Sequence, residues 1–338
     1  MRISLQSWQR VALSIAVILA LTISGTAQTN EGPSPLGDMN IRQAVVHDFA
    51  SYEDTFATAL AFTPDSQSLI CGLANGRVIV LSVPDGIPIA ELPPHEGAVT
   101  SVSCSPDGIW MASSGEDGYA YVTGPADGDS PLALAHVGIL HDIAFSPLGT
   151  YLMTAGEERR VRIWNTATWE ELAPIVGHSG TIYALAISPA EDLLVTGAGG
   201  SDPSIRLWDL ATGVQLQNDL YEGTVYDVEY CPRARDRYAS IAGTQRMIRM
   251  WDVDTGAMRH NVGRFTDAVN DVAYSILGNT LAAVSQDGTF FFTTMPSWTE
   301  KRRIEFDEPL VAVAFSNSRQ YICLSDSTGH VYLLYLPE

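Results

Sequence analysis

The sequence contains little positive charge. Nineteen lysines and arginines stand against 39 aspartates and glutamates, for a formal net charge of -20, and Lys301 is the single lysine. Proteins that bind nucleic acid neutralise its phosphates with a basic surface. The overall charge therefore excludes nucleic acid as the default partner.

Common catalytic and metal-binding motifs are also missing. There is no His-Glu-x-x-His, since His95-Glu96 is followed by Gly-Ala-Val, and there is no phosphate-binding loop. No Cys-x-x-Cys pair occurs, which excludes a zinc site of the knuckle type. If the chain is exported, its four cysteines could form two disulfides. We expect instead that they are buried, unpaired thiols on strands. The cysteines are Cys71, Cys104, Cys231 and Cys323.

The first residues read as a targeting segment. Two arginines precede an apolar run of 14 residues, 11–24, and small residues follow at 25 and 27. This pattern predicts a signal peptide, residues 1–27, cut after Ala27. The run is short for a membrane span, which needs about 20 residues, so an uncleaved anchor is the alternative. We expect an exported protein (periplasmic, cell-envelope or extracellular) with a flexible leader over residues 28–40, and the lack of Asn-x-Ser/Thr acceptors fits a bacterial envelope.

A short alternating segment recurs seven times. The copies begin at residues 57, 99, 140, 182, 225, 269 and 310, so successive starts lie 41 to 44 residues apart. A fixed period of this length indicates a repeat architecture.

Each copy repeats the same pattern of strands and turns. The alternating segment is followed by a turn, a second strand, a tight turn such as Asn75-Gly76 or Asp117-Gly118, and a third strand. Such pairs supply the positive φ angles of hairpins. A further turn leads to a fourth strand before the next copy. Four short antiparallel strands per unit, without helical periodicity, predict an all-β fold, a seven-bladed β-propeller.

Short motifs at fixed places in the copies make the pattern specific. Trp208-Asp209 and Trp251-Asp252 end third strands, Trp164-Asn165 is a near variant, and Gly177-His178 precedes a first strand. With the period, these motifs resemble the WD-repeat propeller family over residues 41–338. The resemblance implies one domain that is not an enzyme, needs no cofactor and binds other proteins through its loops and faces.

The last copy ends after its third strand, which would leave an unpaired sheet edge. The extended segment 41–49 precedes the first copy. We expect this N-terminal segment to supply the missing strand and to close the ring in the last blade by pairing with residues 330–336.

The resemblance also implies a structural tetrad of His, Ser or Thr, Asp and Trp inside single blades. Its expected role is to satisfy buried polar groups and to stiffen each blade. The expected members are His178, Thr196, Asp202 and Trp208; His136, Thr154 and Trp164, with Glu158 near the Asp position; and His95, Ser113 and Asp117, with Thr123 in place of Trp.

The segment Gly177-His178-Ser179-Gly180 falls one residue short of the turn that presents a hydrolase serine. The corresponding places in other copies hold no serine, and no helix follows. We therefore expect Ser179 to be part of the scaffold.

Three groups of residues are candidates for function. The first occupies the second position of the first strands, near the mouth of the expected channel: His141, Tyr183, Tyr226 and Asn270. Aromatic groups gathered on a surface suit a protein or peptide partner; the alternative is packing between blades.

The next position along holds Asp142, Asp227 and Asp271. Carboxylates around one channel can hold Ca²⁺, but we expect these three to accept hydrogen bonds from neighbouring backbone.

The third group is basic and is expected opposite the His178 face, where it would suit an acidic partner. The alternative is local pairing with Asp236, Glu300 and Glu305. Its members are Arg233, Arg235 and Arg237 after one inner strand, and Lys301, Arg302 and Arg303 at a fourth strand.

These observations favour an exported, monomeric, non-catalytic platform that binds a protein or peptide. One rival is a propeller-type hydrolase or lyase acting at the channel mouth, which carboxylates with shifted pKa values would favour. Another is a module that binds a solute or metal ion.

Overall fold

The computed structural model describes residues 43–49, 54–124, 131–232, 237–253, 255, 257–294 and 299–336. The expected signal peptide and leader lie outside these residues. Within them, no helix is long and apolar enough to cross a membrane.

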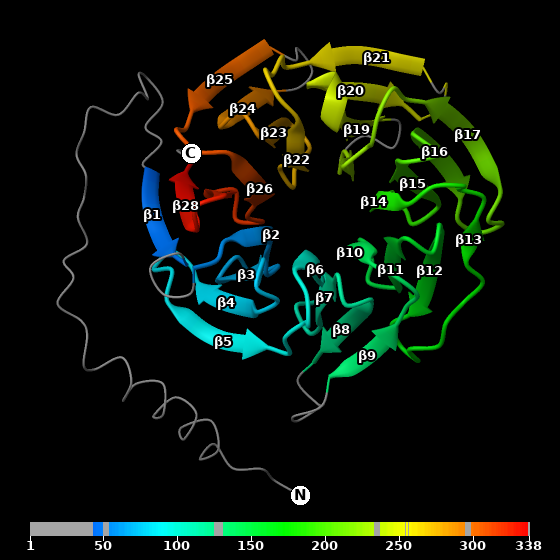
Figure 1. Ribbon diagram of the computed structural model, residues 1–338, viewed down its shortest axis with the longest axis horizontal. Helices are drawn as coiled ribbons and strands as arrows, with labels where there is room; N and C mark the ends of the chain where they lie inside the picture. Colours follow the sequence, from blue (N-terminus) through cyan, green and yellow to red (C-terminus); the bar gives the residue numbers. More distant parts are fainter. Residues whose placement is uncertain are drawn as a thin grey trace, which may run out of the picture. The chain divides into compact units, whose positions relative to one another are not determined.

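The described residues form seven four-stranded antiparallel sheets, arranged as blades around a central axis (Figure 1). The strands of blades one to four, from the axis outward, are β2 (Ala57–Phe62), β3 (Ser68–Leu73), β4 (Val78–Ser82) and β5 (Pro88–Leu92); β6 (Val99–Cys104), β7 (Met111–Gly115), β8 (Tyr119–Thr123) and β9 (Leu132–Ala135); β10 (Leu140–Phe145), β11 (Tyr151–Gly156), β12 (Arg160–Asn165) and β13 (Ile175–Val176); and β14 (Ile182–Ile187), β15 (Leu193–Ala198), β16 (Ser204–Asp209) and β17 (Gln215–Leu220).

Blades five and six repeat this order, and blade seven draws its outer strand from the N-terminal end of the described chain. Their strands are β18 (Asp227–Tyr230), β19 (Arg237–Ala242), β20 (Met247–Asp252) and β21 (Ala257–Val262), with a 3-10 turn η1 (Gly243–Gln245) before β20; β22 (Val269–Tyr274), β23 (Thr280–Ser285), β24 (Thr289–Thr294) and β25 (Thr299–Glu305); and β26 (Leu310–Phe315), β27 (Tyr321–Asp326), β28 (His330–Tyr335) and β1 (Gln43–Asp48). The seven-bladed propeller expected from the repeat is confirmed.

A tight hairpin turn joins the second and third strands of blade one and sets their register. Gly76 lies between β3 and β4 at a φ of 88°, and a Cβ there would overlap the carbonyl oxygen of His95. Glycine reaches this left-handed conformation without the steric cost that a side chain would bring. The Asn75-Gly76 pair therefore forms the tight turn that the sequence predicts at this place.

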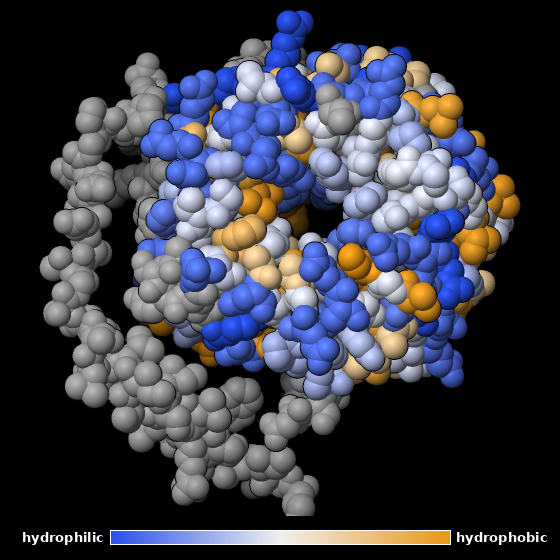
Figure 2. Space-filling view, in the orientation of Figure 1, coloured by the Kyte–Doolittle hydropathy of each residue, from blue (hydrophilic) through white to orange (hydrophobic). Residues whose placement is uncertain are grey.

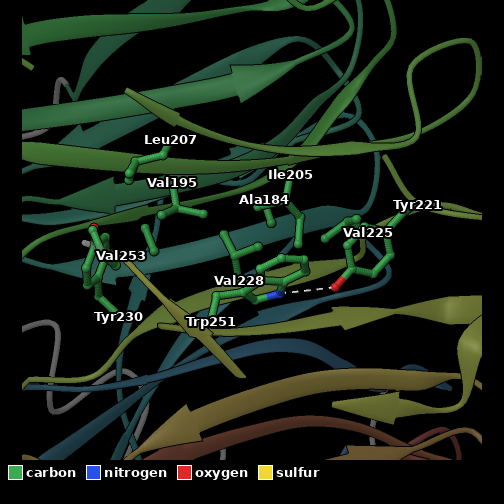
Figure 3. Close-up of a cluster of buried hydrophobic side chains, with 11 residues drawn as sticks. Ala184, Val195, Ile205, Leu207, Tyr221, Val225, Val228, Tyr230, Trp251 and Val253 are labelled. Atoms are coloured by element: carbon green, nitrogen blue, oxygen red, sulfur yellow. Dashed lines mark hydrogen bonds between the residues drawn. The ribbon is translucent and has the colours of Figure 1, made fainter. Parts of the chain in front are cut away.

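Apolar side chains fill the spaces between blades. Figure 3 shows the contact of blades four and five, where Val195 and Leu207 face Val228 and Trp251. Each of these side chains is at most 7% exposed, and burying a residue of this size is worth about 1.5–3 kcal/mol. Successive side chains of a strand point to opposite faces of the sheet. Each blade thus presents an apolar face to each of its two neighbours.

The ring closes as expected, in blade seven. β1 pairs antiparallel with β28, from Gln43 opposite Leu334 to Asp48 opposite His330. Phe49 extends the pairing by donating its amide hydrogen to the Gly329 carbonyl at 2.8 Å. Its ring is 2% exposed and packs in a cluster that joins blades seven and one.

Candidate functional site

A hydrogen-bonded chain of four side chains crosses blade four. His178 bonds through Nδ1 to Asp202 and through Nε2 to Thr196, both at 2.7 Å. Trp208 donates its indole N–H to the Thr196 hydroxyl at 2.9 Å. Burial alone would raise the pKa of Asp202, but hydrogen bonds from Ser204, the Ser179 amide and His178 lower it to about 2. The carboxylate is therefore held ionised, as a fixed acceptor inside the blade.

The same chain shows why Ser179 is scaffold. Both ring nitrogens of His178 are engaged, by Asp202 and by Thr196, so neither is left to take a proton from a serine. The Ser179 amide donates to Asp202 at 2.9 Å, and its carbonyl accepts from Ser201. These bonds fix the loop that leads into β14.

Blades two and three hold weaker versions of the tetrad. His95 bonds to Asp117 at 3.0 Å and to Ser113 at 2.8 Å. The place of the tryptophan is taken by Thr123, which lies opposite Met111 in the register.

In blade three, Thr154 lies 3.3 Å from both His136 and the indole N–H of Trp164. Glu158 lies 3.5 Å from His136. Burial lowers the pKa of His136 to about 4. The structure thus brings together every tetrad residue expected from the sequence.

In blade five a tyrosine, and not a histidine and threonine, provides the acceptor for the tryptophan indole N–H. The sequence analysis did not predict this bond. Tyr221 occupies the position of the histidine, and its hydroxyl accepts the indole N–H of Trp251 at 3.2 Å (Figure 3). A tyrosine placed as far before an inner strand as His178 was the available signal.

The inner strands surround a central channel, which Figure 2 shows as a hollow at the centre of the ring. It holds a cavity of about 370 Å³, lined by residues of all seven inner strands. In blades three and four the register shifts at His141 and Tyr183. Such bulges re-aim a side chain out of the sheet, which explains why the second strand position faces the channel mouth.

Three aromatic rings from successive blades meet at this mouth. The His141 and Tyr183 rings lie 4.4 Å apart between centroids, and the Tyr183 and Tyr226 rings lie 6.3 Å apart in an edge-on arrangement. Tyr226 is 44% exposed. Its ring lies against Gly243, where a Cβ would overlap it. We call His141, Tyr183 and Tyr226 the aromatic arc.

The same position elsewhere in the ring holds blades together. Asn270 donates to the Leu310 carbonyl of the next blade at 2.6 Å, and Thr58 donates to the Val99 carbonyl at 2.6 Å. Asn270 therefore acts as a link between blades, whereas the aromatic arc leaves a ring open to solvent.

Partly buried carboxylates line the channel next to the arc. Asp142 accepts from the Leu185 amide at 2.8 Å, Asp227 from the Val272 amide at 3.0 Å, and Asp271 from the Val313 amide at 2.8 Å. Each aspartate thus bonds to the inner strand of the following blade, as the backbone alternative predicted. In the described part of the chain, no group of three or more His, Cys, Asp or Glu is arranged to hold a metal ion.

A fourth carboxylate was not foreseen. Glu229 follows Asp227 by two residues on β18 and also lines the cavity. Burial, and then the charges of Asp227 and Asp142, raise its pKa well above the ordinary value. The signal was present in the repeat, because the other six copies hold alanine or serine at this place: Ala61, Ser103, Ala144, Ala186, Ala273 and Ala314.

The expected basic group is only partly described. Arg233 and Arg235 lie outside the described residues, and Arg237 and Lys301 are described by backbone alone, in β19 and β25.

Arg302 and Arg303 lie on β25, and the Arg303 guanidinium covers the rings of Phe265 and Phe291 at 5.4 and 5.6 Å. Phe265 stands in blade six where His178 stands in blade four. The Arg303 side chain therefore points toward the His178 face and not, as expected, away from it.

The fold defines a β-propeller, and its tetrads are similar to those of WD-repeat propellers. Three segments, residues 86–122, 130–165 and 169–209, match the family described as WD domain, G-beta repeat. Each runs from the outer strand of one blade to the third strand of the next. The chain is a seven-bladed β-propeller, and about a third of it matches this family.

Several curated proteins resemble the chain. The human serine-threonine kinase receptor-associated protein is 30% identical over 158 residues, covering 46% of this chain and 44% of that protein. Protein HIR1 of Kluyveromyces lactis is 24% identical over 180 residues, covering 43% and 21%. The mouse tRNA (guanine-N(7)-)-methyltransferase non-catalytic subunit WDR4 is 28% identical over 116 residues, covering 34% and 28%. The chain thus spans less than half the length of these relatives, and none of the three supports export or a bacterial origin.

Proposed function

We propose that the chain is a non-catalytic, monomeric platform that binds another protein or a peptide at the channel mouth. The observation that carries this proposal is the aromatic arc. Three rings from three blades adjoin one another beside an open cavity, and Tyr226 keeps 44% of its surface exposed. Rigid aromatic side chains at the edge of a pocket are the usual anchors of protein interfaces.

Relatives support the same direction. WDR4 is by name a non-catalytic subunit, and the kinase receptor-associated protein is by name associated with another protein. A platform that presents a surface to a partner agrees with both descriptions. It also agrees with the tetrads, whose polar side chains hydrogen-bond to one another inside the blades and so are not available for catalysis.

The test is a cross-linked pull-down with the full chain from its native host. The Tyr183→Ala/Tyr226→Ala double variant removes two rings of the arc. Leu148→Ala is the control, because Leu148 is 69% exposed and follows an inner strand, on the face opposite His178. We expect a partner that the wild type and the control capture and the double variant loses. Equal capture by all three would move the site away from the arc, and capture by none would overturn the platform.

A second candidate has an observation of its own. The channel holds carboxylates whose pKa values are raised by burial, to about 6 for Asp142 and about 7 for Asp271, and such groups mark acid–base sites in enzymes. Three of the four carboxylates are, however, bonded to backbone amides, which fixes them as structural acceptors. Turnover of an ester, glycoside or uronate substrate that is lost in Glu229→Gln would favour a hydrolase or lyase.

We also propose that the chain is exported. The proposal rests on the apolar run and the small residues before position 28, which are typical of a cleaved signal. Mass spectrometry of protein from the native host is expected to find an N-terminus at Gln28. Recovery of the intact chain from Met1 in the cytoplasm would contradict it.

A further inference from the structure

The channel gathers four carboxyl groups without a basic side chain beside them. Asp142, Asp227, Glu229 and Asp271 line one cavity of about 370 Å³, and no lysine or arginine is among its described lining residues. Buried charges in proteins are normally paired, because an unpaired ion loses its hydration without compensation. Either the carboxylates stay protonated, or a positive group enters from outside.

The four carboxylates are not equivalent. Asp142, Asp227 and Asp271 each accept a backbone amide of the next blade, and Asp227 and Asp271 are also hydrogen-bonded to each other. Two carboxylates that bond to each other share a proton. These three therefore have an internal use that accounts for their burial.

Glu229 has no such use. Residues two apart on a strand point to the same side, so Glu229 projects into the cavity beside Asp227, and it lines that cavity. Within the described residues no hydrogen bond or ion pair reaches its carboxylate, and the two charges that act on it, Asp227 and Asp142, are both negative. The Glu229 carboxylate is therefore available to accept hydrogen bonds from a group on another molecule.

The mouth of the cavity that Glu229 lines suits an organic cation. Tyr183 and Tyr226 present ring faces and edges at the mouth, and the faces of such rings attract ammonium and guanidinium groups. Burial lowers the pKa of His141, so the third ring of the arc is neutral near pH 7 and does not repel a cation. The cavity, at about 370 Å³, is near the lower limit of ligand pockets, a size for one side chain.

We propose that the channel mouth binds an organic cation, the ammonium or guanidinium group of a lysine or arginine on the partner, with Glu229 as its counter-ion and the aromatic arc around its stem. The proposal rests on the proposed platform function and names the chemistry of its partner. It is also consistent with the net charge of the chain, -20, which draws basic partners toward it.

Titration calorimetry with the full chain tests the proposal. The probes are the blocked tripeptides acetyl-Gly-Arg-Gly-amide and acetyl-Gly-Lys-Gly-amide, with norleucine in place of the basic residue as the neutral isostere, and free spermidine as a cation without a peptide. We expect the basic tripeptides to bind at least tenfold more tightly than the norleucine peptide. Equal binding of the norleucine peptide would overturn the cation, and binding of spermidine alone would overturn the peptide side chain as its source.

Two variants assign the counter-ion. Glu229→Gln keeps the shape of the side chain and removes its charge, and we expect it to lose at least tenfold in affinity for the basic tripeptides. Glu96→Gln removes an exposed carboxylate from the loop before β6, on the same face and outside the cavity, and we expect it to bind as the wild type does. A loss of equal size in both variants would mean general attraction, and no loss in Glu229→Gln would mean that Glu229 is a neutral part of the wall.

The pull-down separates this proposal from the platform itself. If the native partner is lost from the Tyr183→Ala/Tyr226→Ala variant and retained by Glu229→Gln, the platform stands and the cation is refuted. If the partner is retained by the double tyrosine variant, the platform binds it away from the arc, and the cation at the channel mouth is refuted. Loss from both variants, with Glu96→Gln unaffected, is the expected result.

Discussion

Asp142 accepts a hydrogen bond from the backbone amide of Leu185, 43 residues further along the chain, at 2.8 Å. The same link joins Asp227 to Val272 and Asp271 to Val313. In each case the carboxylate of one blade receives the amide of the following blade. The inner ring is thus held by polar links across the apolar spaces between blades, and each link is a place where a substitution has a defined cost.

We expect Asp142→Ala to lower the free energy of unfolding by about 1–3 kcal/mol, because the partly buried Leu185 amide and Ser101 hydroxyl lose their acceptor. Asp142→Asn keeps an acceptor oxygen and should cost less. Urea unfolding followed by circular dichroism measures both. If the two variants were equally stable, the carboxylate would not be the link.

The tetrad of blade four predicts a cost at Thr196. Thr196→Val keeps the shape of the side chain but leaves the Nε2 atom of His178 and the Trp208 indole N–H without a partner, and we expect a loss of about 1–3 kcal/mol. Thr123→Val is the matched control, since no hydrogen bond of the Thr123 hydroxyl is found in the described part of the chain. Comparable losses in both variants would show that the hydroxyl of Thr196 is not what matters.

Asp271 predicts that part of the stability falls as the pH rises. Burial raises its pKa from 3.8 to about 7 in the folded chain. Between these values the folded chain keeps a proton that the unfolded chain has lost, so stability decreases from about pH 4 to about pH 7 and is level above. Asp271→Asn removes this titrating group and should make the decrease smaller, while the raised pKa values of Asp142, Asp227 and Glu229 keep part of it. Melting temperatures at pH 5 and pH 8 test the difference; an unchanged pH slope in the variant would contradict it.

The cysteines predict an order of reactivity. All four are free thiols, three of them buried and Cys104 partly buried. Burial, and then the charges of Asp107 and Asp65, raise the pKa of Cys104 to about 11, and burial raises the pKa of Cys71 well above its ordinary value. A thiol reagent should label Cys104 slowly in the folded protein and the others only after unfolding. Cys104→Ser should abolish the early phase, and rapid labelling of Cys71 in the native state would refute this order.

The architecture was within reach of the sequence because its determinants are local. Alternation of residues and Gly-containing turns act over a few positions, and the period shows the same solution used seven times. Ring closure could be predicted because the last copy lacks a fourth strand and an extended segment precedes the first copy.

The site was harder to predict because it depends on departures from the repeat. Tyr221 replaces a histidine and still satisfies Trp251, which a search for the usual residue passes over. Glu229 has a consequence only because Asp227 and a cavity lie beside it. The direction of Arg303 depends on a contact with Phe265, which is distant in sequence. Contacts between blades involve residues of different repeat copies, so the sequence of a single copy does not predict them.

The pairing of β1 with β28 makes the last blade a check on the completeness of the chain. Residues 43–48 pair with residues 330–334, so nearly the whole polypeptide must be present before the ring can close. Contacts between such distant segments form slowly. A chain ended before residue 330 would keep an open sheet edge in blade seven and expose Phe49 and its neighbours. Truncated products would therefore be marked by the very surfaces that chaperones and proteases recognise.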